Sequence, residues 1–396
     1  MKMANRGEVT QVRPITQRPI LLDEMLRPMW KCLRYSGIHH RFLSPMEERR
    51  RFYLFRCVST VLIVFLLLIF DSIYFRDLYA SLLNKERLTD IFRNVVGAVN
   101  GFTITIFVYQ FYTNHQQLVE FYKDWNQVEM QFSRTNRTNR TNRIVTIYYL
   151  SFYTIVTFSC VSSFIHILVL PDSPFSLIRF AWAFIFSFNS YITVILIFLR
   201  EMLPAFFYYQ AGCAIENLEL QLQNCIVPFN NHHSTHLIDG NPYHGIWKRY
   251  ETIKGLVDRA NQLFGVTVVT NQLSYICMTC LIIYIIVFPN DEGSYDFTHI
   301  VTFILAVLRI FWVNWVMSQV YLSCEKLGNS VASVLSQQWH LDSGDNRVML
   351  TSFLLRLNNE NVAACPLNLY NIDPSNLLTL FTLHASYIIF LLQIHD

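Results

Sequence analysis

Five residues near the end of the chain have the spacing of one face of an α-helix. They are Thr379, Thr382, Ser386, Ile389 and Gln393, each three or four residues from the next. Hydroxyl and carboxamide groups can replace part of the hydration shell of a cation, and an apolar ring can close a pore by dewetting. Lipid satisfies no hydrogen bonds, so this polar stripe must face either a partner helix or water. Periodicity alone leaves open whether the stripe is a packing seam or the lining of a pore.

The helix that carries the polar stripe is expected to cross a membrane. Asp373 is a favoured N-cap residue and Pro374 suits the first helical position, so the helix start is well marked. The 21 residues from Pro374 to Ile394 include no charged side chain, and about 20 such residues span a bilayer. His384 lies on the face opposite the stripe, where we expect it to pack against the rest of the chain.

The composition of the whole chain is that of a membrane protein with several spans. Hydrophobic residues make up 53% of the 396 residues, charged residues make up 15%, and the mean hydropathy is +0.29. Soluble globular proteins carry about 25% charged residues. The N-terminal residues contain no apolar core, so no cleavable signal peptide is expected.

Hydrophobic runs predict an all-α membrane protein with seven transmembrane helices. The predicted spans lie near residues 57–75, 95–112, 144–170, 177–199, 264–288, 299–322 and 374–394. The expected organisation is an N-terminal segment over 1–55, spans one to four within 56–200, helical extensions with a mobile loop over 201–263, spans five and six within 264–322, a segment with an amphipathic helix over 323–371, and the last span within 372–396.

The distribution of basic residues predicts how the chain is oriented in the membrane. With the N-terminus inside, the cytoplasmic segments hold about 24 of the 31 lysines and arginines, and the external loops hold about four. The N-terminus is therefore expected in the cytoplasm and the C-terminus outside, which is the reverse of a G-protein-coupled receptor. The sequons at Asn136 and Asn139 would then face the cytoplasm and carry no glycan.

Motifs for catalysis, metals and cofactors are not evident. None of the nine cysteines falls in a predicted external loop, so structural disulfides are not expected. Cys277 and Cys280 form a CxxC pattern with no second pair, and the histidines at 232, 233 and 236 lie in a polar loop. There is no HExxH, no GxSxG and no phosphate-binding glycine loop. We expect a protein that is not an enzyme, holds no cofactor or metal and binds no nucleic acid.

A ligand pocket is expected in the outer halves of spans two to six. Arg309 lies near the middle of span six, and ionisable residues at that depth are costly and often functional. It can pair with a carboxylate such as Asp71, line an aqueous pocket, or bind an acidic or carbonyl-bearing ligand. Aromatic rings beside a few polar groups suit a small organic ligand. The candidates are Arg309, Trp182, Asn189, Phe186, His166, Asn100, Thr302 and Tyr284, with Thr103, Ser159 and Ser163 nearby.

The end of the last helix resembles the C-terminal signature of the insect gustatory receptors. That signature is Thr-Tyr, five hydrophobic residues and Gln-Phe, and here Ser386-Tyr387 is followed by IIFLL and Gln393-Ile394. Tyr387 and Gln393 match. Ser386 replaces Thr conservatively, whereas Ile394 in place of Phe is a departure. The preceding NVAACPLNLYNIDPSNLL also resembles the lead-in to the final helix of that family.

The resemblance implies a tetrameric cation channel, without strict ion selectivity, that small-molecule tastants open in chemosensory neurons. Four copies of the last helix would form the pore, with Gln393 at the gate and Tyr387 beside it. The cytoplasmic helix extensions would form the contacts between subunits, which are identical or include other gustatory receptors. An odorant receptor of the related family and a metabotropic receptor that signals through a G protein are the alternatives.

Overall fold

A computed structural model describes residues 88–132, 177–226, 242–287, 297–337, 344–360 and 362–395, with shorter pieces between 65 and 83 and between 146 and 165. The helices are α3 (Leu88–Thr113), α4 (His115–Phe132), α6 (Leu177–Ile226), α7 (Pro242–Val287), α8 (Phe297–Gln337), α9 (Gly344–Asn359), the short 3-10 helix η2 (Pro366–Asn368) and α10 (Pro374–His395). No strand occurs among these residues, and the predicted all-α class is confirmed for the part that the structure describes.

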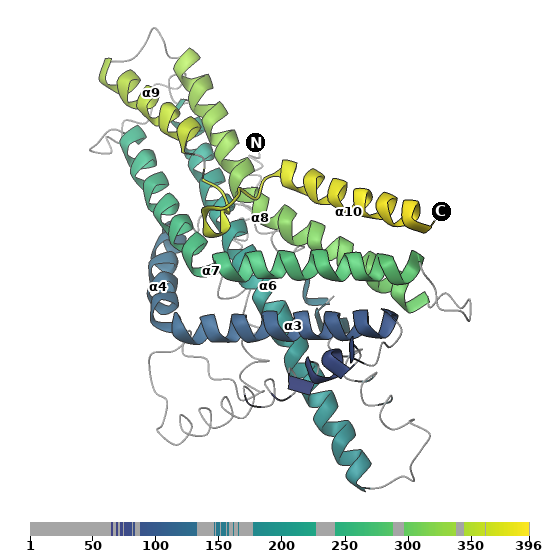
Figure 1. The fold of residues 1–396 in the computed structure, drawn as a ribbon. Coiled ribbons are helices and arrows are strands. Elements are labelled where there is room, and N and C mark those ends of the chain that lie inside the picture. Colours follow the sequence, from purple (N-terminus) through teal and green to yellow (C-terminus); the bar gives the residue numbers. More distant parts are fainter. Residues whose placement is uncertain are drawn as a thin grey trace, which may run out of the picture.

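Three long helices, α6, α7 and α8, form the centre of the fold (Figure 1). α6 packs against both α7 and α8, while α3 lies along α7. α10 contacts α7 and α8, and its C-terminus lies at the same end of the protein as the C-terminus of α7 (Figure 1). α9 packs against α7 and α8 at the opposite end. The last helix is therefore attached to the long helices along one side.

α6 and α7 extend well beyond the hydrophobic runs that predict spans four and five. α6 continues without a break from residue 177 into the segment after residue 200 that was predicted as a helical extension, and α7 begins at Pro242, well before residue 264. Within the described ranges, the segments Tyr191–Cys225 and Tyr243–Cys280 are long and apolar enough to cross a membrane. The number of spans, predicted as seven, stays a prediction.

α4 is a helix that the hydrophobic runs did not predict. Its buried side chains are Leu118, Phe121, Tyr122, Trp125 and Val128, which recur with helical periodicity. The ring centroids of Phe121 and Trp125 lie 4.8 and 4.9 Å from that of Phe207 on α6, in edge-to-face arrangements. This periodicity is visible in the sequence, but charged residues on the other face make the segment too polar to register as a span.

The middle of α6 is the most enclosed part of the fold. Every residue from Leu199 to Tyr209 is buried, including Arg200 and Glu201, which are 2% and 1% exposed. Pro204 lies within this stretch and has no amide hydrogen, so the carbonyl of Arg200 loses its helical donor. The boundary predicted between span four and the polar extension therefore falls inside the core.

The segment Val362–Asp373, which we call the lead-in, joins α9 to α10 and lies against α7. The side chain of Asn261 on α7 accepts a hydrogen bond from the amide of Cys365 at 2.8 Å and donates one to the carbonyl of Ala363 at 3.2 Å. Leu367 and Asn368 in η2 have φ values of 54° and 57°, in the left-handed region that is costly for Leu and better tolerated by Asn. The contacts with α7 must offset that cost.

Gly265 on α7 allows the lead-in to approach. A Cβ atom at this position would lie 2.7 Å from the backbone nitrogen of Leu367. Because that neighbour is backbone in an already unfavourable conformation, it cannot move aside as a flexible side chain would. The absence of a side chain at residue 265 thus determines how closely the lead-in packs on α7.

We predict that Gly265→Ala displaces the lead-in and destabilises the purified protein by about 1–3 kcal/mol. A fluorescence-monitored thermal melt should show a lower Tm than that of the unchanged protein. Gly328→Ala is the control, since the nearest atom to its Cβ would lie 4.0 Å away. Equal melting temperatures for the two variants would contradict the proposed close packing.

Candidate functional site

The polar stripe of α10 is uncovered along its length. The side chains of Thr379, Thr382, Ser386, Ile389 and Gln393 are all exposed in the single chain. The hydroxyls of Thr379 and Thr382 donate to carbonyls one turn earlier in their own helix, at 3.1 and 2.9 Å. These two hydroxyls therefore need no partner helix to satisfy them as donors, and their lone pairs can still accept.

The opposite face of α10 attaches the helix to α7. The Nε2 atom of His384 lies 2.5 Å from the hydroxyl of Thr279, and its Nδ1 atom lies 2.6 Å from the carbonyl of Leu380. A carbonyl only accepts, so Nδ1 carries the proton in that contact. His384 is thus a packing residue, as its place on the helix predicted. Tyr387 is also partly buried, unlike the residues of the stripe.

Large apolar side chains flank the polar stripe. Leu378, Phe381, Leu383 and Phe390 are each between 48% and 67% exposed in the single chain, and Ile389 within the stripe is 55% exposed. An exposed apolar surface of this extent is unusual for a protein surrounded by water, and marks contact with lipid or with another chain. We therefore expect one face of α10 to contact lipid or another chain.

The start of α10 is confirmed as predicted. The carboxylate of Asp373 accepts hydrogen bonds from the amide of Asn376 at 3.0 Å and from the hydroxyl of Ser375 at 2.6 Å. This is the N-cap geometry that satisfies an amide left free at the first turn. The cap and Pro374 together determine where the lead-in ends and the helix begins.

Arg309 is paired with Glu201, and the suggested partner Asp71 lies outside the described residues. The Nε atom of Arg309 donates to the Glu201 carboxylate at 2.5 Å, and the hydroxyl of Tyr275 donates to the other carboxylate oxygen. The guanidinium also lies 4.2 Å from the ring centroid of Phe198. The Glu201 side chain is fully buried. Its contacts with Arg309 and Tyr275 therefore explain how the arginine and the carboxylate are tolerated inside the protein.

A second arginine extends this cluster toward α3. Arg200 lies 3.9 Å from the Glu201 carboxylate and donates to the hydroxyl of Thr103. Thr103 donates in turn to the carbonyl of Asn100, whose side-chain oxygen accepts from Ser274 at 3.2 Å. We call Arg200, Glu201, Tyr275 and Arg309 the Glu201 cluster. Two of the predicted pocket residues, Asn100 and Arg309, thus belong to one network, in which the ion pair of Arg200 with Glu201 joins two sets of hydrogen bonds.

A small polar cavity adjoins the Glu201 cluster. It encloses about 10 Å³ and is lined by Arg200, Glu201, Tyr275, Asn271, Gln272 and Asn314, together with five other residues. That volume holds about one water molecule, so an organic ligand does not fit in it. The Nε atom of Arg200 and the Oδ1 atom of Asn271 are buried without a hydrogen-bond partner in the part of the chain that the structure describes.

The other predicted pocket residues cannot be placed relative to this cluster. The side chains of Trp182, Phe186, Asn189, Tyr284 and Thr302, and the whole of His166, Ser159 and Ser163, lie outside the described residues. The pocket therefore stays a prediction.

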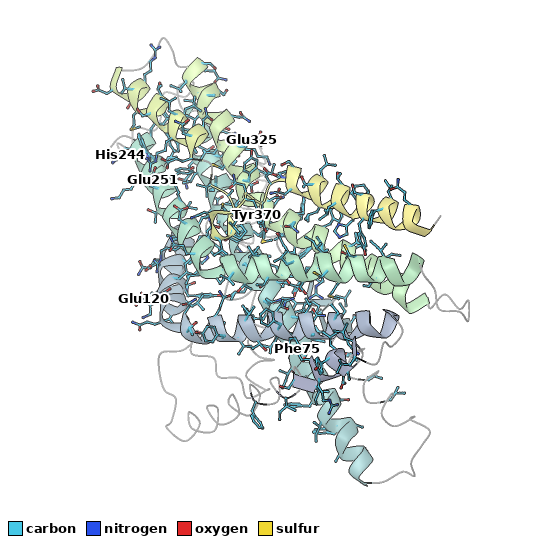
Figure 2. The ribbon with its side chains drawn as sticks, viewed as in Figure 1. Phe75, Glu120, His244, Glu251, Glu325 and Tyr370 are labelled. Carbon is cyan, nitrogen blue, oxygen red and sulfur yellow. The ribbon has the colours of Figure 1, made fainter. Side chains whose placement is uncertain are left out.

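A chain of hydrogen bonds connects the lead-in with the edge of this cavity. The hydroxyl of Tyr370 in the lead-in, which is labelled in Figure 2, donates to the side-chain oxygen of Gln272 on α7. Gln272 donates in turn to Asn314 on α8 at 2.7 Å. Burial raises the pKa of Tyr370 to about 12, so its hydroxyl keeps its proton at physiological pH. Gln272 and Asn314 both line the cavity beside Arg200 and Glu201.

Sequence reasoning missed the contribution of Glu201. The Arg200-Glu201 pair follows an apolar run, which is why it was assigned to a polar extension. The available signal was the apolar sequence after it, residues 202–209, which continues the helix as part of the core.

For metal binding, the described residues contain no group of three or more His, Cys, Asp or Glu side chains placed to hold an ion.

The comparisons with known proteins agree with this architecture. Among solved structures, the insect olfactory receptor OR5 from Machilis hrabei superposes with a TM-score of 0.69 at 17% sequence identity, covering 94% of this chain and 98% of that chain. The same receptor in complex with eugenol gives a TM-score of 0.66, with the same identity and coverage. At 17% sequence identity, the similarity between these structures shows a shared fold and nothing more specific. A comparison with curated proteins gives no match.

A family model provides the assignment. The model described as "7tm Chemosensory receptor" matches residues 26–396. The match includes the three long helices, the lead-in and α10, and members of this family are not enzymes. Because it extends over nearly the whole sequence, the chain belongs to the 7tm chemosensory receptor family.

Proposed function

We propose that this protein is a gustatory receptor that acts as a tastant-gated cation channel in the plasma membrane of sensory neurons. The proposed receptor has seven spans, a cytoplasmic N-terminus and an external C-terminus. Four subunits, identical or mixed with other gustatory receptors, place their α10 helices around a central pore.

One observation carries this proposal: the polar stripe of α10 is exposed while the opposite face packs against α7. A stripe that served as a packing seam within the chain would be covered by α7 or α8. Here His384 and Tyr387 lie toward the covered side, and Thr379, Thr382 and Ser386 do not. In a ring of four subunits, these hydroxyls would line the wetted part of the pore, Ile389 would form an apolar constriction, and Gln393 would contribute to the gate.

The proposed stimulus is a small organic molecule. The olfactory receptor of similar fold has been solved with eugenol, which supports a ligand of this class for the present chain. The proposed pocket comprises Arg309, Asn100, Trp182, Phe186, Asn189, His166, Thr302 and Tyr284. Arg309 would act there through its guanidinium edge, since its Nη2 atom has no hydrogen-bond partner among the described residues while Nε is held by Glu201.

An odorant receptor is the second candidate, and the similarity in fold to an olfactory receptor favours it. The presence of both Tyr387 and Gln393 at their positions in the C-terminal signature favours the gustatory branch. Both candidates are channels, whereas a metabotropic receptor would need a G protein and a nucleotide. Recording currents from excised patches without nucleotides, while a panel of tastants and odorants is applied, separates all three.

We predict that an epitope tag at the N-terminus stains only after permeabilisation and that a tag at the C-terminus stains on intact cells. The reason is the concentration of lysine and arginine in the segments assigned to the cytoplasm. A glycan on Asn136 or Asn139, or surface staining of the N-terminal tag, would show that the orientation is wrong.

We predict that single cysteines at positions 379, 382, 386, 389 and 393 react with a charged thiol reagent in open channels and change the current. The stripe would be wet only when the channel conducts, so modification should require ligand. Current recordings during reagent application measure the rate at each position.

Cysteines at positions 380 and 384 are the matched controls, because Leu380 and His384 lie on the covered side of the same helix. If these positions react and those of the stripe do not, α10 faces the pore with its other side or does not line it.

We predict that Arg309→Met reduces surface expression, because it leaves the buried Glu201 carboxylate without its closest cation. Removing one partner of a buried ion pair costs about 3–5 kcal/mol. The double variant Arg309→Met/Glu201→Gln should recover expression, since the Glu201 cluster then has the same net charge as before. Surface biotinylation measures the surface expression of the single and the double variant.

Arg356→Met is the control for this pair. Its partner Glu251 lies at the surface, where the Arg356 and Glu251 side chains are 41% and 32% exposed, and a pair of this kind contributes about 0–1 kcal/mol.

Dose–response curves of the double variant Arg309→Met/Glu201→Gln then test whether Arg309 contacts the ligand: a shift in potency supports that role. Unchanged curves from a well-expressed channel would exclude Arg309 from the pocket.

A further inference from the structure

A groove of about 630 Å³ lies between α4 and α7, and none of its lining residues belongs to the polar stripe or the Glu201 cluster. The lining residues are Asp124, Gln127 and Val128 from α4, with Gly245, Lys248, Arg249, Thr252, Gly255, Leu256 and Arg259 from α7. In Figure 2, Glu120 marks α4, and His244 and Glu251 mark the part of α7 that carries the groove. In the proposed topology this part of the receptor faces the cytoplasm.

The charges that line the groove are mostly positive. Lys248, Arg249 and Arg259 are cations, and Asp124 is the one carboxylate in the lining. The Nζ atom of Lys248 has no partner among the described residues, and Arg249 donates to the neutral amide of Gln221 at 2.8 Å. These two side chains therefore offer positive charge that no carboxylate of the groove neutralises.

The third cation is available to a competing anion. Arg259 donates to the carboxylate of Asp124, but their side chains are 41% and 49% exposed. Ion pairs at such exposure contribute about 0–1 kcal/mol, because water screens them and both side chains lose freedom. A phosphate with two negative charges can replace the single charge of Asp124 at little cost.

Two glycines leave the floor of the groove open. A Cβ atom at Gly245 or Gly255 would meet no atom within 4 Å, so packing does not require glycine at either position. Glycine within a helix costs about 1 kcal/mol relative to alanine. Exposed helix backbone in a concave, basic surface gives a ligand close access to the cations on either side.

The size and lining of the groove define the chemistry of its ligand. The positions from Lys248 to Arg259 extend about 16 Å along α7, which exceeds the width of one phosphate. No aromatic ring is among the described residues that line it, so stacking on a nucleotide base is not available. Thr252 and Gln127 offer neutral hydrogen-bonding groups suited to hydroxyls. This combination fits a polyol ring that carries several phosphates.

We propose that the groove between α4 and α7 binds an inositol polyphosphate group, with Lys248 and Arg249 holding one phosphate and Arg259 another. The group can come from a free inositol phosphate or from the headgroup of a phosphoinositide in the membrane. Binding on this side of the receptor would be separate from stimulus binding, and it does not depend on which stimulus opens the channel.

The test is direct binding to the purified full chain in nanodiscs. Fluorescently labelled inositol trisphosphate is titrated in one arm, and nanodiscs with or without phosphatidylinositol bisphosphate are compared by native mass spectrometry in the other. The double variant Lys248→Gln/Arg249→Gln should weaken binding by about tenfold or more, equivalent to about 1.4 kcal/mol. Gly255→Leu should do the same by filling the groove without changing its charge.

Lys123→Gln is the matched control, because Lys123 is an exposed cation of α4 that does not line the groove. Binding in the first arm assigns a soluble anion, and binding in the second arm alone assigns the lipid headgroup. An equal loss of affinity in Lys123→Gln would show non-specific attraction and overturn the proposal. So would an unchanged affinity in Gly255→Leu, or the absence of binding in both arms.

Discussion

The buried carboxylate of Glu201 links the three long helices at the centre of the protein. It belongs to α6 and accepts hydrogen bonds from Arg309 of α8 and Tyr275 of α7. A buried charge is tolerated only while its partners stay in place, and an unpaired one costs several kcal/mol. Sliding any of these helices along another by one turn would break at least one of these bonds. The positions of α3, the lead-in and α10 follow, because each of them contacts α7.

The last helix was the most predictable part of the chain, because its signals are local. Asp373 and Pro374 mark a helix start through the chemistry of one turn, and the structure has the cap as expected. The spacing of Thr379, Thr382 and Ser386 sorts the faces of the helix without knowledge of any neighbour. His384 on the opposite face was accordingly expected to pack, and it contacts Thr279.

The Glu201 cluster and the lead-in were not predictable in the same way. Glu201 and Arg309 are 108 residues apart, and a single sequence does not reveal which of many carboxylates a buried arginine will meet. Leu367 and Asn368 adopt a left-handed conformation without the glycine that normally signals it. The glycine that the turn requires is Gly265 on another helix, so the pattern exists only once the two segments lie together.

The lead-in clamps the base of α10, a rod that is also attached to α7 and α8 along its covered side. The clamp consists of the contacts of Asn261, Gln272 and Gly265 with the lead-in. From Pro374, a rise of 1.5 Å per residue places position 379 at about 8 Å and position 393 at about 29 Å along the rod. One degree of tilt about the clamp therefore moves the far position sideways by about 0.5 Å and the near one by about 0.1 Å. The same small rotation that scarcely alters the base of the helix is magnified about fourfold at its tip.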